Sequence, residues 1–327
     1  MKKKNNGFKY FLIVLFTVFV LIFIDQRITN VFISSQREKV VINIKKGESL
    51  STIAEMLEDS GVIENREVFK FFAKISKIEG KLQAGRYELY KNSNEYQVLD
   101  KIHKGRVILK PVTIPEGLTY KQIASKIKKN ADIDSVLFVR LCENAEILKE
   151  FKIPSKNAEG FLFPETYYIS DETDEEDIVR MMLEKFSEKL PDSMFAPNEF
   201  KFSKYQYIIL ASIIEKEAKL NEEKPLIAGV YYNRLKKGML LQCCATVFYA
   251  LNKVGGKLTY RDLEFSSPYN TYKNPGLPPT PICSPSISSV MSVLKPLQSK
   301  YLFYVSNGDG THTFTANYKE HIKAQKK

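Results

Sequence analysis

The strongest hydrophobic pattern in the chain is an unbroken apolar run from Tyr10 to Ile24, preceded by lysines and followed by Asp-Gln-Arg. A helix of about 20 apolar residues spans a bilayer. Positively charged flanks stay on the cytoplasmic side. The pattern therefore predicts a cytoplasmic tail at 1–7, a transmembrane helix at 8–26 and a polar tether at 27–38.

A cleaved signal peptide is the alternative interpretation of the same run. Cleavage needs small residues at the end of the apolar segment, and Leu21–Ile24 are all large. We therefore expect an uncleaved, single-pass protein of the cytoplasmic membrane, bound to the membrane through this helix. We expect its N-terminus to lie in the cytoplasm and everything after Arg27 to lie outside.

A repeated pattern follows the tether. Asn43–Leu57 aligns without a gap with Thr113–Ile127. Each copy reads as a short strand, a glycine turn, a hydroxyl side chain as helix N-cap and a helix with apolar residues at i, i+3 and i+7. The first copy resembles the opening of a LysM module, a βααβ fold that binds N-acetylglucosamine polymers. We expect a LysM-like module at 39–108, and a second LysM-like repeat with connecting helices at 109–157. Glycan contact and plain packing both remain open for this unit.

The remaining chain, 158–327, is expected to form a mixed α+β domain, which makes the fold class α+β overall. Its acidic stretch 170–177 precedes a predicted helix at 178–189, where carboxylates complement the helix dipole. A calcium loop is the alternative, but the spacing lacks the glycine and terminal glutamate of an EF-hand.

A second predicted helix, from Tyr205 to Leu220, has apolar residues on nearly every side and a capping box at its start. A carboxyl group on such a buried helix is costly unless it is paired or has a function. Glu215 and Glu217 lie on different stripes of this helix, about 200° apart. Because both stripes are apolar, the pattern does not choose between them, and a salt bridge is the structural alternative for either.

Composition narrows the function classes. The net charge of +11 favours an anionic neighbour, but no zinc finger, basic zipper or nucleotide-stacking motif is present, so we expect no nucleic-acid partner. None of the four cysteines has a C-x-x-C partner, and the three histidines have no ligand spacing. We therefore expect no metal and no cofactor.

The run Leu210–Glu217 resembles the signature of the endolytic murein transglycosylases, the MltG or YceG-like family. Further pieces follow in the family's order: Glu159–Tyr167, Gly229–Leu235, Leu241–Gln242, Thr246–Val247, Ser267–Tyr272, Gly276–Ile282 and Tyr304–Phe314. One departure stands out, because Cys243 and Cys244 occupy the place of a small polar residue and an Asp in relatives. A thiol cannot accept hydrogen bonds as a carboxylate does. We expect altered substrate positioning there, with a thiol redox switch as the alternative.

The resemblance implies cleavage of the bond between N-acetylmuramic acid and N-acetylglucosamine, with formation of a 1,6-anhydro end. It places the catalytic glutamate on Glu215, whose pKa we expect the apolar helix to raise toward the role of a general acid. Candidate substrate-binding residues are Asn233, Gln242, Thr246, Asn270, Thr271, Tyr272 and Glu165.

Implied partners are peptidoglycan glycan strands, which the enzyme would cleave as they form so that their length is limited, and the membrane-bound glycan polymerases, the penicillin-binding proteins. Two alternatives remain. One is a membrane-anchored peptidoglycan-binding scaffold without turnover. The other is an aminodeoxychorismate lyase, which would need a pyridoxal-phosphate lysine in a cytosolic fold.

Overall fold

The computed structural model describes residues 38–130 and 133–326. The predicted tail, the transmembrane helix and all of the tether except Glu38 lie outside the described residues. Among the described helices, none has both the length and the apolar character that a membrane crossing requires. The described chain forms two compact units, one of residues 38–109 with 170–172, the other of residues 110–169 and 173–326.

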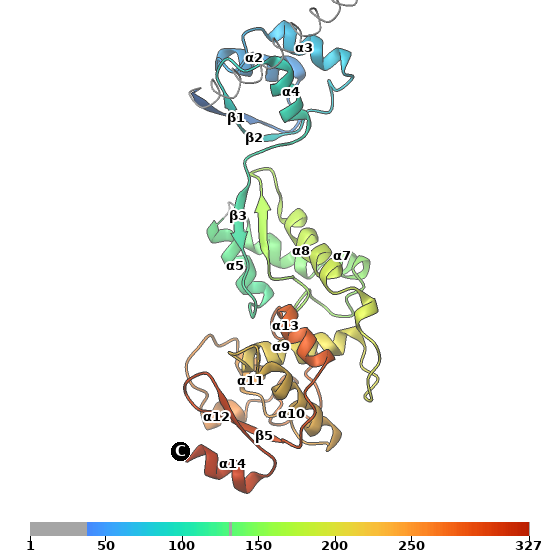
Figure 1. Ribbon diagram of the computed structural model, residues 1–327, viewed down its shortest axis with the longest axis vertical. Coiled ribbons are helices and arrows are strands. Elements are labelled where there is room, and N and C mark those ends of the chain that lie inside the picture. Colours follow the sequence, from blue (N-terminus) through green and yellow to red (C-terminus); the bar gives the residue numbers. More distant parts are fainter. Residues whose placement is uncertain (1–37, 131–132, 327) are drawn as a thin grey trace, which may run out of the picture. The chain divides into compact units, whose positions relative to one another are not determined.

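The first unit contains a two-stranded antiparallel sheet covered by helices (Figure 1). Its strands pair from Lys39 opposite Tyr90 to Ile44 opposite Gly85. The elements in chain order are β1 (Lys39–Ile44), α2 (Leu50–Asp59), α3 (Arg66–Ile75), β2 (Gly85–Tyr90) and α4 (Glu95–His103). This order contains the predicted βααβ arrangement. The LysM-like identity of the module and any glycan contact stay predictions.

The second unit is mostly helical, with two small antiparallel sheets in its described part. Its first half contains β3 (Lys110–Thr113), α5 (Tyr120–Asn130), α6 (Ser135–Cys142), α7 (Ala145–Glu150), β4 (Thr166–Ile169), α8 (Glu175–Lys189) and the short 3-10 helix η1 (Asp192–Met194). Its second half contains α9 (Lys204–Glu217), α10 (Lys224–Lys236), α11 (Cys244–Ala250), α12 (Tyr260–Leu263), α13 (Ile287–Leu294), β5 (Phe303–Ser306), β6 (His312–Thr315) and α14 (Tyr318–Gln325). The described residues thus show the predicted mixture of helices and short strands.

The two copies of the repeat adopt the predicted local structure. Gly47 and Gly117 follow the strands with φ of +88° and +77°, a backbone region that favours glycine. Ser49 then caps α2 by accepting a hydrogen bond from the Thr52 amide, and Thr119 accepts one from the Gln122 amide at the start of α5. The strand, turn and capped helix predicted from each copy are confirmed.

Each unit has its own hydrophobic core. The core of the first unit consists of buried side chains between Ile42 and Ile102. The core of the second unit runs from Val112 to Val293, and it includes residues from both the predicted second repeat, 109–157, and the predicted α+β domain, 158–327. At its centre α9 packs against α10, α11 and α13, and every residue from Tyr207 to Ile214 is buried. This packing fixes the position of the carboxyl groups at the end of α9.

Candidate functional site

The two candidate carboxyl groups lie in the last turn of α9. Ser203 and Gln206 form the predicted capping box, with Ser203 Oγ accepting from the Gln206 amide and Gln206 Oε1 accepting from the Ser203 amide at 2.9 Å. The helix ends at Glu217, three residues earlier than predicted, because Ala218 is extended with φ of −97° and ψ of 123°. Glu215 and Glu217 therefore stand where α9 meets neighbouring segments.

Glu215 points into a polar network at the start of α13. Its Oε2 accepts hydrogen bonds from the Ser286 amide at 2.8 Å, from the Ser286 hydroxyl at 2.5 Å and from the Ser289 hydroxyl at 2.6 Å. The Lys224 ammonium lies 3.4 Å from the same oxygen, and the two side chains are only 4% and 7% exposed. A carboxylate in this position also complements the positive end of the α13 dipole. The arrangement is that of a buried, satisfied ion pair.

The charge state of Glu215 differs from the expectation. Burial pushes its pKa upward, as the apolar helix predicted, but the hydrogen bonds from Ser286 and Ser289 and the charge of Lys224 outweigh burial. The pKa of Glu215 is therefore lowered, and the expectation of a raised value is wrong. The sequence signal missed these partners because Ser286 and Ser289 lie about 70 residues away from Glu215 in the chain.

Glu217 has different surroundings. Its Oε2 accepts a hydrogen bond from the Tyr304 hydroxyl at 2.6 Å, and its Oε1 accepts one from the Cys243 thiol at 3.0 Å. Both donors, a phenol and a thiol, are neutral groups, whereas the Lys224 ammonium pairs with Glu215.

A cavity of about 710 Å³ opens beside Glu217. Glu217 is its only carboxylate lining residue, and Glu215 does not line it. The walls come from the start of α5, the end of α9, α11 and the segment after it: Thr119, Gln122, Lys216, Lys219, Cys244, Ala245, Phe248, Tyr249, Lys253, Val254, Gly255, Gly256 and Ile282. This combination of a carboxyl group, apolar side chains and lysines suits a polar ligand with apolar faces.

A second cavity of about 390 Å³ adjoins the first, since the two share lining residues that include Thr119 and Tyr249. One of its lining residues is Glu159, which is fully buried. Burial raises the pKa of Glu159 to about 8, although its Oε1 accepts from the Tyr120 amide and its Oε2 from the Tyr249 hydroxyl. Through these two hydrogen bonds Glu159 connects the start of α5 to α11 at the wall of the second cavity.

The glycine after Glu159 has a steric reason. Gly160 has φ of +83°, and a Cβ at this position would lie 2.4 Å from Cβ of Pro281. Only glycine allows the loop to approach the Pro-rich segment so closely. The Glu-Gly pair of the 159–167 motif therefore fixes the backbone below the cavity.

The structure joins several of the predicted binding residues around the start of α11. Thr271 Oγ1 accepts a hydrogen bond from the Cys243 amide at 2.9 Å and shares one with Thr246 Oγ1 at 2.9 Å. The Thr271 carbonyl accepts from the Gln242 amide. The Gln242 side chain is exposed, on a backbone with φ of +50°. Thr271 and Thr246 are buried, so these two threonines hold the segment that carries Cys243 against Glu217.

The side chains of two other predicted binding residues, Asn270 and Asn233, hydrogen-bond to backbone carbonyls. The fully buried Asn270 amide donates to the carbonyls of Leu263 and Phe265, both at 2.8 Å. The Asn233 side-chain amide donates to the backbone carbonyls of Ser299 and Tyr301.

Two predicted residues have more exposed surroundings. Tyr272 contacts the Cys244 thiol through its hydroxyl at 3.1 Å, next to the cavity. Glu165 is exposed at the start of β4 and is not among the residues that line the Glu217 cavity. Substrate contact by any of the seven predicted binding residues stays a prediction.

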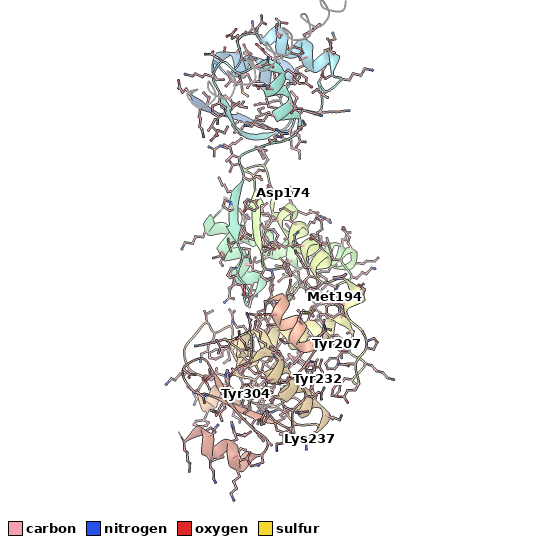
Figure 2. All side chains as sticks on the ribbon, viewed as in Figure 1. Asp174, Met194, Tyr207, Tyr232, Lys237 and Tyr304 are labelled. Carbon is pink, nitrogen blue, oxygen red and sulfur yellow. The ribbon has the colours of Figure 1, made fainter. Side chains whose placement is uncertain are left out.

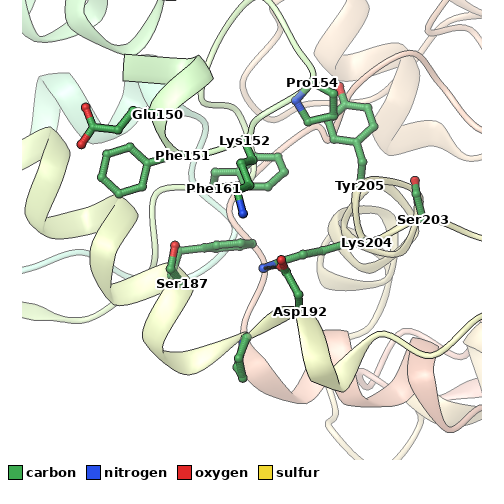
Figure 3. A pocket seen from close by; sticks show the side chains of 12 residues that line it. Glu150, Phe151, Lys152, Pro154, Phe161, Ser187, Asp192, Ser203, Lys204 and Tyr205 are labelled. Atoms are coloured by element: carbon green, nitrogen blue, oxygen red, sulfur yellow. Dashed lines mark hydrogen bonds and ion pairs between the residues drawn. The ribbon is translucent and has the colours of Figure 1, made fainter. Parts of the chain in front are cut away.

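A separate cavity of about 550 Å³ contains none of the candidate residues (Figure 3). Lys204, seen beside Asp192 in the close-up, lies 2.8 Å from its carboxylate and also donates to the Leu190 carbonyl. Its ammonium is thus already paired.

No group of three or more His, Cys, Asp or Glu side chains in residues 38–130 and 133–326 is arranged to hold a metal ion. Cys243 and Cys283 are buried free thiols and Cys244 is an exposed one. The expectation of a reaction without metal or cofactor stays an expectation.

Comparisons with known proteins agree with the resemblance in the sequence. Residues 42–327 match the YceG-like family. A Bacillus subtilis protein named endolytic murein transglycosylase is 36% identical over 309 residues, covering 88% of this chain and 84% of that protein. A Streptococcus pneumoniae protein of the same name is 29% identical, covering 88% of this chain and 58% of its own length. The crystal structure of a YceG-like protein from Listeria monocytogenes superposes with a TM-score of 0.61 at 35% identity, covering 88% of this chain and 98% of that one. The chain therefore belongs to the YceG-like family.

Proposed function

We propose that this protein is an endolytic lytic transglycosylase that cleaves the β-1,4 bond between N-acetylmuramic acid and N-acetylglucosamine within nascent peptidoglycan strands. Family membership and the names of the relatives support a peptidoglycan substrate and this class of enzyme. The observation that carries the proposal for the site is the single carboxyl group, Glu217, at the wall of a 710 Å³ cavity.

The proposed reaction needs one group that gives and then takes a proton. The carboxyl group of Glu217 protonates the glycosidic oxygen as the bond from C1 of the muramic residue to that oxygen breaks. The 6-hydroxyl of the same muramic residue then attacks C1 and returns its proton to Glu217. One carboxyl group suffices because no water is consumed and the nucleophile belongs to the substrate.

Glu217 fits this role better than Glu215, which the family resemblance suggested. The Oε2 atom of Glu215 is surrounded by three hydroxyl or amide donors and an ammonium, and the lowered pKa keeps the group ionised. Glu215 also does not line the cavity, whereas Glu217 does. We therefore propose Glu217 as the catalytic residue and Glu215 as a structural ion pair, while the earlier assignment to Glu215 remains the competing hypothesis.

Among the predicted binding residues, we distinguish proposed substrate contacts from residues that hold the neighbouring loops in place. Tyr272 and Gln242 are the proposed substrate contacts, because the Tyr272 hydroxyl contacts the cavity residue Cys244 and the exposed Gln242 precedes Cys244 by two residues in the chain. Asn270, Thr271 and Thr246 are proposed to hold these loops in place through the hydrogen bonds described above.

The proposal is tested by digesting purified peptidoglycan with the full-length protein in detergent and measuring the masses of the new chain ends by mass spectrometry. We expect muramic ends that are lighter by one water than hydrolysed ends, released from the interior of strands. Hydrolysed ends would contradict the reaction type. Binding to peptidoglycan without any new ends would favour the scaffold alternative.

We also propose that the apolar run at 8–26 anchors the protein in the cytoplasmic membrane with its N-terminus inside. A tether of about 12 residues extends at most about 40 Å, which would keep the enzyme near newly made strands and near the glycan polymerases as partners. A long rigid spacer after Arg27 should leave activity on isolated peptidoglycan unchanged but lengthen the strands in cells that carry only this variant. Unchanged strand length would contradict the anchoring proposal.

A further inference from the structure

The side chains behind Glu217 form a hydrogen-bond chain that the proposed reaction does not use. The Tyr304 hydroxyl donates to Glu217 Oε2, and the hydroxyls of Tyr304 and Tyr231 lie 2.8 Å apart. A phenol carries one proton. Because the hydroxyl proton of Tyr304 points to Glu217, Tyr231 is the donor and Tyr304 the acceptor in the hydrogen bond between the two tyrosines. Tyr231 is 1% exposed, so this chain ends inside the core.

The two tyrosines remain donors throughout the working range of pH. Burial raises the pKa of both Tyr304 and Tyr231 well above the usual value, and the neighbouring Glu217 acts in the same direction. Burial likewise raises the pKa of the Cys243 thiol. The three groups that surround the carboxyl group from behind are therefore neutral donors of fixed protonation.

These donors are unequal. The phenol of Tyr304 makes a short O–H···O hydrogen bond of 2.6 Å, whereas the thiol of Cys243 is a weak donor. An oxygen with a strong donor stabilises negative charge better than an oxygen with a weak one. The two oxygens of Glu217 therefore differ, although the carboxyl group itself is symmetrical.

We propose that Tyr304, supported by Tyr231, and Cys243 are positioning residues for Glu217. Before the reaction the weak Cys243 thiol leaves Oε1 as the oxygen that carries the catalytic proton, and once that proton has gone to the glycosidic oxygen the Tyr304 hydroxyl stabilises the resulting negative charge on Oε2. This inference rests on the proposed role of Glu217. It also gives a function to Cys243, one of the two cysteines that depart from the family pattern.

Other titratable groups around the Glu217 carboxyl group are the same in the wild type and in every variant that is compared with it, so they do not account for differences between the pH profiles. Lys216, Lys219 and Lys253 line the cavity, Cys244 and Tyr272 lie on its α11 side, and His312 packs edge-on against Tyr304 while pairing with Glu223. A difference between variants that changes only a donor to Glu217 reports on that donor.

The test is the pH dependence of kcat/KM of the full-length protein on soluble, uncrosslinked glycan strands. Its alkaline limb reports loss of the acid's proton in the free enzyme. Tyr304→Phe removes a donor that favours the ionised form, so we expect the limb to move to higher pH by about one pH unit. Cys243→Ser replaces the thiol by a hydroxyl, which is a stronger donor to the ionised carboxyl group, so we expect the alkaline limb to move to lower pH. Tyr231→Phe should act as Tyr304→Phe does, more weakly, and should have no further effect when Tyr304 is already Phe.

Tyr232→Phe is the matched control. Tyr232 follows Tyr231 on α10, and its hydroxyl donates to the Val293 carbonyl at 3.0 Å, away from Glu217. Figure 2 labels Tyr232 together with Tyr304. The control also loses a tyrosine hydroxyl, but its alkaline limb should stay in place.

An alkaline limb that is the same in wild type, Tyr304→Phe and Tyr232→Phe would overturn this inference, as would movement of Cys243→Ser to higher pH. If Tyr304→Phe does not fold, Tyr231→Phe and Cys243→Ser still decide the question. Failure of the proposed function looks different, because the wild-type protein would then release no anhydro ends at any pH.

Discussion

Replacing Glu217 by glutamine should reduce the release of anhydro ends by about 10²-fold to 10⁴-fold, the usual contribution of general acid–base catalysis. The amide keeps the shape of the side chain but cannot give a proton to the glycosidic oxygen. The measurement is the initial rate of new anhydro ends from purified peptidoglycan, with circular dichroism to verify folding.

Glu215→Gln is the paired variant on the same helix. Because Glu215 does not line the cavity, the activity of this variant per folded molecule should be close to that of the wild type. If Glu215→Gln loses the activity and Glu217→Gln keeps it, the assignment from the family resemblance is right and the one from the geometry is wrong.

The second large effect concerns stability. Glu215→Gln should lower the free energy of unfolding by about 3 kcal/mol, because it leaves the Lys224 ammonium buried without its counter-charge. Chemical denaturation near pH 7 measures this difference. The exposed pair of Arg180 and Glu176 is the control, since Glu176→Gln should cost at most about 1 kcal/mol. Equal losses for the two variants would contradict a structural role for the Glu215 pair.

The same pair predicts a dependence on pH. The pKa of Glu215 is lower in the folded protein than its ordinary value of 4.5. Its stabilising contribution is therefore complete above pH 4.5 and is lost as the pH falls through the folded value. The Glu215→Gln variant should lack this part of the acid destabilisation, and a parallel fall in both proteins would speak against the lowered pKa.

Local features of the fold could be predicted from the sequence because they depend on neighbouring residues. The capping box of Ser203 and Gln206 and the acidic start of α8, where Asp174 and Asp177 cap each other, are examples. The glycine turns of the two repeat copies are another. In the two capping boxes the hydrogen bonds join residues only three positions apart in the chain.

The arrangement of the site was beyond prediction because its contacts are distant in sequence. Periodicity could not choose between the two faces of α9, since both are apolar and buried. The choice depends on Ser286 and Lys224 around one carboxyl group and on Tyr304 and Cys243 around the other. The early end of α9 also depends on Ala218, a residue that gives no local stop signal.

The separate hydrophobic cores of the two units have a consequence for calorimetry. Buried side chains between Ile42 and Ile102 form one core, and those between Val112 and Val293 form the other, with no residue in common. Two-state unfolding describes a single cooperative core, so one melting temperature does not describe this chain. Heat absorption should resolve into two transitions, and a substitution at Glu215 should move only the one that belongs to the second core. The other transition then serves as an internal reference within the same scan.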